Sequence, residues 1–391
     1  MSDVVSDVVN EAGAETRSPL HAEHVALGGV MVPFAGWLMP LRYSSDLAEH
    51  QGVRAAAGIF DLSHMGEIRI TGPQAGALLD YALVGHLSAV PVGRARYTMI
   101  CAADGGVVDD LVVYRTDEDA YLVVANASNH TVVLAELGLR SAGFDATVTD
   151  ESAETALIAV QGPRAQDIVT SVTERRDVDD VAKLKYYTGL PATVGGIPAL
   201  VARTGYTGED GFELFVPAAT APGLWRELLA AGEPHGLVPA GLSARDSLRL
   251  EAGMPLYGNE LDRTTTPFDA GLGRVVKLDK ADDAGEPLDF VGRAPLTARK
   301  FAEPARVLVG LQGLGRRAAR HGYPVLRSTD HPGVVVGQVT SGAPSPTLGH
   351  PIAMAYVTPE VSAVGTELAV DVRGRAEPVR VVALPFYRRA Q

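Results

Sequence analysis

The chain has 391 residues with a formal net charge of −13, and 46% of its residues are hydrophobic. This length is enough for two or three domains with full cores, and this composition excludes a disordered chain. The acidic balance argues against general nucleic-acid binding, and no apolar run reaches the length of a membrane span. The single cysteine, Cys101, excludes an intrachain disulfide and a multi-cysteine metal site, and it predicts a cytoplasmic location.

The charge is unevenly spread along the chain. The first 17 residues are acidic and small, and they lack the features of a secretory signal, so we expect a mobile tail. From Arg299 onward there are 12 Lys and Arg against 6 Asp and Glu. This basic piece indicates either an anionic partner or substrate on that side, or a solvated arginine-rich surface.

The N-terminal two-thirds has the pattern of a duplicated unit. Residues 66–72 predict a strand, and Pro73 opens a helix because proline suits the first helical turn. The elements expected next are three strands and a helix that Ser128 or Asn129 caps and Gly143 stops: 96–102, 107–115, 120–126 and 129–142.

The same series starts again at residue 156. A strand over 156–162 again ends in Gly-Pro, and Pro163 opens a second helix. A hairpin and a helix follow at 199–204, 212–216 and 220–231. Such units place helices on mainly antiparallel sheets, although strand-Gly-Pro-helix is common enough to recur by coincidence.

After about residue 300 the pattern becomes all-β. Six short strands are expected, which predicts a small barrel or sandwich, at 306–312, 323–327, 333–340, 351–357, 366–373 and 378–384. The stretch 279–287 is a plausible linker before it.

Two predicted hairpins each carry an acidic residue after a glycine-rich turn. In the first, Asp110 shares a strand face with Tyr114, whereas Asp109 points to the other face, so replacing Asp109 is expected to cost far less activity. Both faces are apolar, so an acid there is hydrogen-bonded, paired or catalytic, unless the pair is solvated near the hairpin end. In the second, Glu213 follows the loop TGYTGEDG, where Asp-Gly is a hairpin signal because glycine accepts a positive φ.

Two further polar residues are candidates for the same site. Asn126 ends a strand and offers both a donor and an acceptor, although it could simply form a turn. Arg245 lies in the first turn of a predicted helix with Ser243 as its N-cap and Asp246 completing a capping box. An arginine there opposes the helix dipole, so it is either a surface residue or has a carboxylate or carbonyl partner.

Seven blocks, in order, resemble the glycine cleavage system T-protein family over nearly the whole chain from Ser18 to Arg388: PFAGWLMPLRY (33–43), GIFDLSHMGEIRITGP (58–73), GGVVDDLVVY (105–114), VQGP (160–163), RTGYTGEDGFEL (203–214), GLSARDSLRLEAGMPLYG (241–258) and TSGAPSPTLGHPIAMAYV (340–357). The resemblance implies a three-domain cloverleaf around a folate channel. Its folate-binding region, 18–285, would hold two intertwined α+β domains, and 286–391 would form a C-terminal β-barrel.

The resemblance also implies the reaction and its partners. The lipoylated H-protein would bring an S-aminomethyl group, tetrahydrofolate would take the one-carbon unit, ammonia would leave, and 5,10-methylenetetrahydrofolate would form. No metal, flavin, nucleic acid or membrane is expected to take part. The alternatives are a folate-dependent demethylase of the same fold and a non-catalytic folate-binding accessory protein.

By motif match, the family's catalytic acid corresponds to Asp110. The pterin-gripping glutamate corresponds to Glu213 and the folate-contacting arginine to Arg245. The remaining positions expected to line the pocket are Tyr97, Tyr114, Val124, Asn126 and Tyr206. Arg388, with Tyr387 beside it, is expected near the folate tail.

Overall fold

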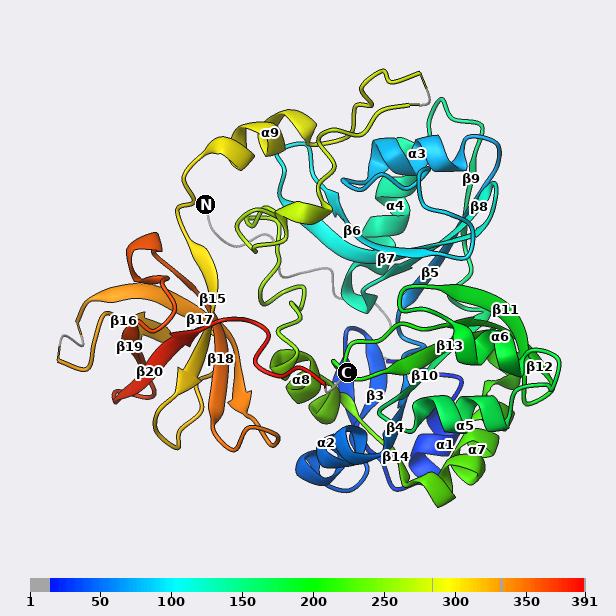
Figure 1. Ribbon diagram of the computed structural model, residues 1–391, viewed down its shortest axis with the longest axis horizontal. Coiled ribbons are helices and arrows are strands. Elements are labelled where there is room, and N and C mark those ends of the chain that lie inside the picture. The colour runs from blue at the N-terminus through cyan, green and yellow to red at the C-terminus, as the bar shows by residue number, and fades with distance from the viewer. Residues whose placement is uncertain (1–14, 283, 331–332, 390–391) are drawn as a thin grey trace.

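The computed structural model describes residues 15–282, 284–330 and 333–389, and the chain forms three lobes (Figure 1). Two lobes are α+β units with mainly antiparallel sheets, and the third is a closed β-barrel. The predicted fold class is therefore confirmed. Each lobe has its own hydrophobic core. The domain boundary at residue 285 stays a prediction.

The first unit is continuous in sequence. Its sheet has the strand order β6-β7-β8-β5-β9, and its helices cover one face of that sheet (Figure 1). Its elements are β5 (Gly66–Thr71), α3 (Ala75–Ala82), β6 (Ala95–Cys101), β7 (Val107–Asp117), β8 (Ala120–Ala125), η1 (Ala127–Asn129), α4 (His130–Arg140) and β9 (Thr147–Asp150). All the strands and helices predicted here are present, and β9 was not predicted.

The second unit repeats this topology with additions. Its sheet has the order β11-β12-β13-β10-β4-β14. Its elements are β4 (Ala57–Asp61), β10 (Thr155–Gln161), α5 (Ala165–Ser171), α6 (Val178–Lys183), β11 (Gly189–Val194), β12 (Ile197–Ala202), β13 (Gly211–Pro217), η2 (Ala218–Thr220), α7 (Ala221–Gly232), η3 (Glu233–His235) and β14 (Leu237–Pro239).

Matching the two sheets corrects one prediction. The order of the first sheet pairs β6, β7, β8 and β5 with β11, β12, β13 and β10 of the second. Asp110 lies on β7 and Glu213 on β13, so the two acids do not occupy equivalent strands, and their hairpins are not repeats of one another. The sequence pattern does not reveal β11, and this strand shifts the second series by one position.

The second sheet also contains a strand from before the first unit. β4 lies between β10 and β14, antiparallel to β10 and parallel to β14. The first unit is therefore inserted in the sequence of the second. Elements outside the two repeats complete this lobe: β1 (Thr16–Arg17), α1 (His21–Ala26), β2 (Val30–Phe34), β3 (Trp37–Arg42), α2 (Asp46–Ala55) and α8 (Leu242–Glu251).

The expected N-terminal tail is shorter than predicted. Thr16 and Arg17 pair with Trp37 and Leu38 as β1, parallel to β3. The rest of the predicted tail, residues 1–14, lies outside the described residues.

The barrel closes in the order β15-β18-β17-β16-β19-β20 (Figure 1). All six predicted strands are present, as β15 (Val307–Gly313), β16 (Pro324–Leu326), β17 (Val335–Pro344), β18 (Pro351–Val357), β19 (Glu367–Asp371) and β20 (Ala376–Val382), with η5 (Pro359–Val361) between β18 and β19. Before it come η4 (Gly273–Val275) and α9 (Arg293–Phe301), and Leu296 of α9 packs with Met99 and Val107 of the first unit.

The predicted linker is anchored at Lys280. Its buried ammonium donates to the carbonyl oxygens of Leu83 at 2.8 Å and Gly85 at 2.9 Å, and also to that of Asp80. Asp80 lies in the last turn of α3, and Leu83 and Gly85 follow the helix. Lys280 therefore fixes the predicted linker to the first unit.

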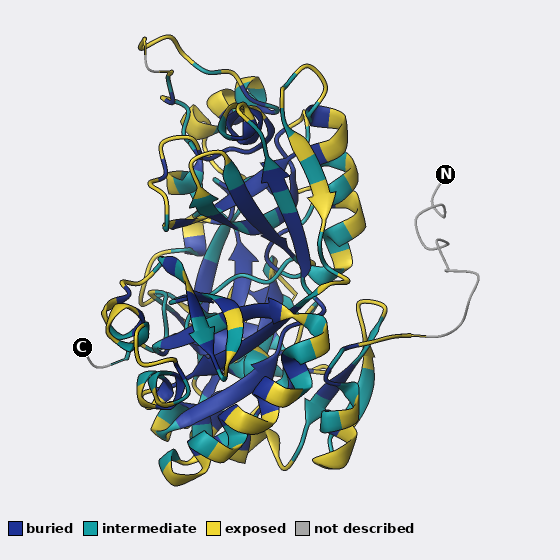
Figure 2. Cartoon of the chain, turned by 90° about the vertical axis from the view of Figure 1, so that its right-hand side faces the viewer, coloured by how far each residue is buried: buried dark blue, intermediate teal, exposed yellow. Residues whose placement is uncertain are grey.

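The two α+β units meet through a shared apolar layer. Tyr114 and Val124 of the first unit pack with Phe215 of the second, and the rings of Tyr114 and Phe215 lie 5.5 Å apart. Figure 2 shows buried strands running through both lobes. This layer holds β7 and β13, and so Asp110 and Glu213, in one rigid arrangement. No helix among the described residues is long and apolar enough to cross a membrane.

Candidate functional site

Asp110 is a half-buried carboxylate whose two oxygens are both fixed by neighbours. The Tyr97 hydroxyl donates to Oδ2 at 2.8 Å, and the Asn126 amide donates to Oδ1 at 2.9 Å. Burial raises the pKa of Asp110, and these two hydrogen bonds only partly offset that rise. The structure therefore brings the three residues together, and the acid is neither a solvated surface group nor an ion-paired one.

Asp109 also differs from the expectation. It is fully buried, and its carboxylate accepts three hydrogen bonds: from the Asn126 backbone N–H at 2.9 Å, the Asn126 amide at 2.8 Å and the Asn129 amide at 2.8 Å. Asn129 is the N-cap residue of α4, but its side chain bonds Asp109 instead of capping the helix. Asp109 therefore shares the Asn126 amide with Asp110, and the expectation that its replacement costs far less activity stays a prediction.

The glycine-rich loop before β13 is organised by Gln161, at the end of β10. The Gln161 amide donates to the Thr204 carbonyl at 3.0 Å and accepts from the Thr207 hydroxyl at 3.0 Å. A Cβ at Gly205 or Gly211 would lie 1.9 Å or 2.4 Å from the Gln161 amide. Gly211 is thus required for close approach and not, as predicted, for a positive φ.

The Glu213 carboxylate is hydrogen-bonded through one oxygen only. The hydroxyl groups of Thr204 and Tyr114 both donate to Oε2, the latter at 3.2 Å, and they lie 2.8 Å from each other. Oε1 accepts no hydrogen bond from any described residue. One carboxylate oxygen of Glu213 therefore stays available for a ligand.

Arg245 lies on α8 with its guanidinium over the ring of Tyr206, 4.7 Å from the ring centre. It makes no hydrogen bond or ion pair with the described residues, and burial lowers its pKa while the nearby charge of Glu213 opposes that change. The predicted capping box is wrong: Gly241 is the N-cap, and Asp246 instead accepts from Arg249 at 2.8 Å.

Tyr187 joins the two halves of this cluster and was missed from the sequence. Its backbone carbonyl accepts from the Ala95 N–H at 2.9 Å and its N–H donates to the Arg203 carbonyl at 3.0 Å, so it links the two units. Burial raises the pKa of Tyr187, and the charges of Glu213 and Asp110 add to the rise. Its φ is +60°, a strained backbone conformation that residues other than glycine adopt infrequently. Tyr187 could not be predicted from the sequence, because backbone strain cannot be read from it.

The other tyrosines close around the same space. Burial and the Asp110 charge raise the pKa of Tyr97 far above its usual value, and Tyr206 and Tyr187 contribute to that rise. The Tyr206 hydroxyl donates to the Pro255 carbonyl. Tyr97 thus contacts Asp110, Tyr114 contacts Glu213 and Tyr206 stacks with Arg245, and we call this set of rings the aromatic enclosure.

The C-terminal segment reaches the glycine-rich loop but not the acids. Arg54 stacks on Tyr387, with 4.0 Å to the ring centre, and Arg389 lies 3.4 Å from Asp210, three residues before Glu213. Arg388 between them is exposed and forms no hydrogen bond or ion pair with the described site residues.

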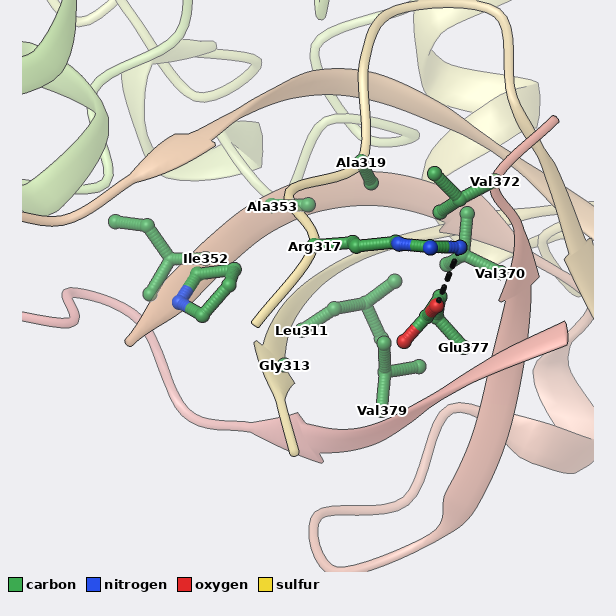
Figure 3. Close-up of a pocket in the computed structure, with 11 residues that line it drawn as sticks. Leu311, Gly313, Arg317, Ala319, Ile352, Ala353, Val370, Val372, Glu377 and Val379 are labelled. Atoms are coloured by element: carbon green, nitrogen blue, oxygen red, sulfur yellow. Dashed lines mark ion pairs between the residues drawn. The ribbon is translucent and has the colours of Figure 1, made fainter. Parts of the chain in front are cut away.

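Two cavities lie elsewhere. One, inside the barrel beside the Arg317–Glu377 ion pair, has about 10 Å³, room for little more than one water molecule (Figure 3). The other, about 510 Å³, lies between residues 258–265 and strands β17 and β18, and contains Arg306. No group of three or more His, Cys, Asp or Glu side chains among the described residues is arranged to hold a metal ion.

Sequence comparison identifies the chain. Residues 20–280 match the family described as the GCVT N-terminal domain, and residues 306–388 match the glycine cleavage T-protein C-terminal barrel domain. The chain belongs to the glycine cleavage T-protein family. Both α+β units and the barrel fall inside these two matches.

Comparison with individual proteins supports the assignment to the T-protein family. The aminomethyltransferases of Streptomyces coelicolor and Saccharopolyspora erythraea are each 61% identical, over 95% of this chain and 98% of theirs. The crystal structure of the glycine cleavage system aminomethyltransferase T from Bartonella henselae is 35% identical with a TM-score of 0.85, over 96% of this chain and 98% of that one. The chain is thus an enzyme of the aminomethyltransferase type.

Proposed function

We propose that this enzyme transfers the one-carbon unit of the S-aminomethyl-dihydrolipoyl H-protein to tetrahydrofolate, with release of ammonia and formation of 5,10-methylenetetrahydrofolate. The observation that carries the proposal is Asp110, a half-buried carboxylate held by Tyr97 and Asn126 inside the aromatic enclosure. A cytoplasmic location belongs to the same proposal.

The residues fit a pterin as one of the reactants. A pterin presents an N–H and an amino group side by side, and a carboxylate can accept from both. Glu213 offers its free Oε1 there, while Thr204 and Tyr114 hold Oε2 in place. Arg245, which has no hydrogen-bond partner among the described residues, is available for the pterin carbonyl. Arg388 is exposed near the loop and is proposed for the anionic folate tail.

Asp110 would act as the proton-handling group. Because burial raises its pKa, its carboxylate holds a proton more readily than an exposed aspartate. It can therefore keep the attacking amine unprotonated and pass the proton toward the leaving amine. Tyr97 and Asn126 orient the two oxygens, and the tyrosine rings exclude water from the enclosure.

The test is ammonia release from aminomethylated H-protein, measured with and without tetrahydrofolate. The proposal expects release that depends strongly on the folate. Turnover of a small N- or S-methyl donor without H-protein would instead identify a folate-dependent demethylase. Folate binding without turnover of either donor would identify a binding protein, and both results contradict the proposal.

A further inference from the structure

Asp109 and Asp110 are neighbouring carboxylates joined through one amide group. The Asn126 amide nitrogen lies 2.8 Å from Asp109 Oδ1, 2.9 Å from Asp110 Oδ1 and 3.2 Å from the Asp110 carbonyl oxygen. All three are acceptors, so the NH₂ end of the amide must face them. Its two hydrogens are therefore shared between the two carboxylates.

Asp109 is the better anchored of the two acids. It is fully buried, and the Asn126 backbone N–H and the Asn129 amide hold it in addition to the shared amide. These contacts come from β8's end and from the start of α4, so they fix Asp109 to the rigid first unit. Asp110, by contrast, is half-buried and faces the enclosure.

We propose that Asp109 is a positioning residue for the reaction: it holds the Asn126 amide in the orientation that donates to Asp110, and its charge sets the proton affinity of Asp110. The inference rests on the proposed function, because it takes Asp110 as the reacting acid. Asp109 itself touches no substrate in this arrangement and acts only through Asn126 and through its field.

The electrostatics agree with this geometry. Burial and the charge of Asp110 raise the pKa of Asp109 to about 7, and the interaction between the two carboxylates is reciprocal. A like charge beside Asp110 disfavours its ionised form. The polar groups that face the pair besides Asn126 and Asn129 are the carboxylate of Glu260 and four tyrosine hydroxyls, those of Tyr97, Tyr187, Tyr206 and Tyr257.

The test compares Asp109→Asn with wild type in the full chain. We expect folate affinity within about twofold of wild type, a kcat about 10- to 100-fold lower through misplacement of Asp110, and an acidic limb of the kcat–pH profile about one unit lower. A purely structural role would lower the melting temperature and the active fraction without moving that limb. Unchanged kcat and an unchanged profile would overturn the proposal.

A double-mutant cycle tests the route through Asn126. If Asp109 acts by orienting that amide, the losses of Asp109→Asn and Asn126→Ala in kcat should be far from additive. Fully additive losses would show that the two residues act separately and would overturn the inference.

A second variant covers the case in which Asp109→Asn does not fold. Asn129→Ala removes one donor from Asp109 but leaves the hydrogen bonds of Asp110 intact. It should move the acidic limb in the same direction by a smaller amount, and no movement would count against the proposal. If Asp110→Asn also retained full activity, Asp110 would not be the reacting acid, and the inference for Asp109 would fall with it. Failure of the proposed function is a separate result, because it would appear as the absence of folate-dependent ammonia release in the wild type.

Discussion

Glu251 is expected to be a main stabilising contact between the barrel and the rest of the chain. It is fully buried near the C-terminal end of α8. One oxygen accepts from Arg54 at 2.8 Å, His50 at 3.1 Å and the Thr347 hydroxyl at 2.7 Å, and the other accepts from the Thr347 backbone N–H at 3.1 Å. The carboxylate thus joins α2, α8 and the β17–β18 loop.

We predict that Glu251→Gln destabilises the enzyme by about 3 kcal/mol. Removing one partner of a buried ion pair costs about 3–5 kcal/mol, and the remaining amide oxygen can still accept from Thr347, which favours the lower end. The pKa leads to a similar figure. Burial alone would raise the pKa of Glu251, but hydrogen bonds from His50 and Ser345 hold it at about 2 instead of 4.5. That difference corresponds to about 2–3 kcal/mol once solvent screening is allowed for.

The sign of the pH dependence follows from the lowered pKa. The stabilisation by Glu251 is fully present above pH 4.5 and is lost as the pH falls from 4.5 toward 2, because only the unfolded state then binds the proton. Urea unfolding at a series of pH values measures this for the wild type and for Glu251→Gln. The variant should lack this part of the acid-induced loss.

A matched control is Glu367→Gln on the barrel surface, where the Glu367 side chain is 69% exposed and pairs with Arg380. It should change stability by less than about 0.5 kcal/mol. The reasoning is refuted if Glu251→Gln is as stable as this control, or if wild type and Glu251→Gln lose stability equally between pH 4.5 and 2.

Four further predictions concern activity. Asp110→Asn should keep the fold and folate affinity but lower turnover by about 10²- to 10⁴-fold, and near-normal turnover would remove Asp110 from proton transfer. Glu213→Ala should weaken folate binding by about 10- to 150-fold in a titration, since a lost charge-assisted hydrogen bond costs about 1.5–3 kcal/mol. Cys101→Ser should stay active, because burial raises the pKa of the thiol to about 12 and keeps it unreactive, and a folded but inactive variant would contradict this. Arg316→Glu should raise the apparent KM for H-protein at low salt, as added salt should for the wild type, and a KM that is flat with salt would mean that the basic barrel surface does not steer the partner.

Charge reversal at Arg316 tests the basic barrel surface more cleanly than charge reversal at the adjacent Arg317. Arg317 lies 3.4 Å from Glu377, so a glutamate there would also introduce a repulsion inside the barrel (Figure 3). Arg316 is exposed and has no ion pair among the described residues, so a charge reversal there changes the surface field alone.

Sequence patterns predicted the elements whose signals are local. The Gly72-Pro73 and Gly162-Pro163 joints marked the start of α3 and α5, and strand spacing marked the barrel. β4 and β14 were not predicted as members of the second sheet, because a short apolar strand does not indicate which distant segment it pairs with, and here Asp61 pairs with Ile158 and Ala57 with Leu237.

For the site, side-chain alternation and motif resemblance named the right residues but not their contacts. Asp109 was set aside because it faces away from Asp110, yet Asn126 reaches both where β8 ends. Ser243 is a residue type that favours the N-cap position, but α8 begins two residues earlier, with Gly241 as its N-cap. These outcomes depend on how separate segments meet, which single-strand periodicity does not encode.

The insertion of the first unit into the second has a consequence for how this chain is made and can be rebuilt. The ends of the inserted unit lie together, since Ile68 of β5 is opposite Asp150 of β9, and the host strands on either side also meet, with Asp61 opposite Ile158. During synthesis the inserted unit can complete its own sheet while β4 still waits for β10 to emerge. The same closeness makes this junction the natural place to excise, exchange or circularly permute that unit without stretching its host.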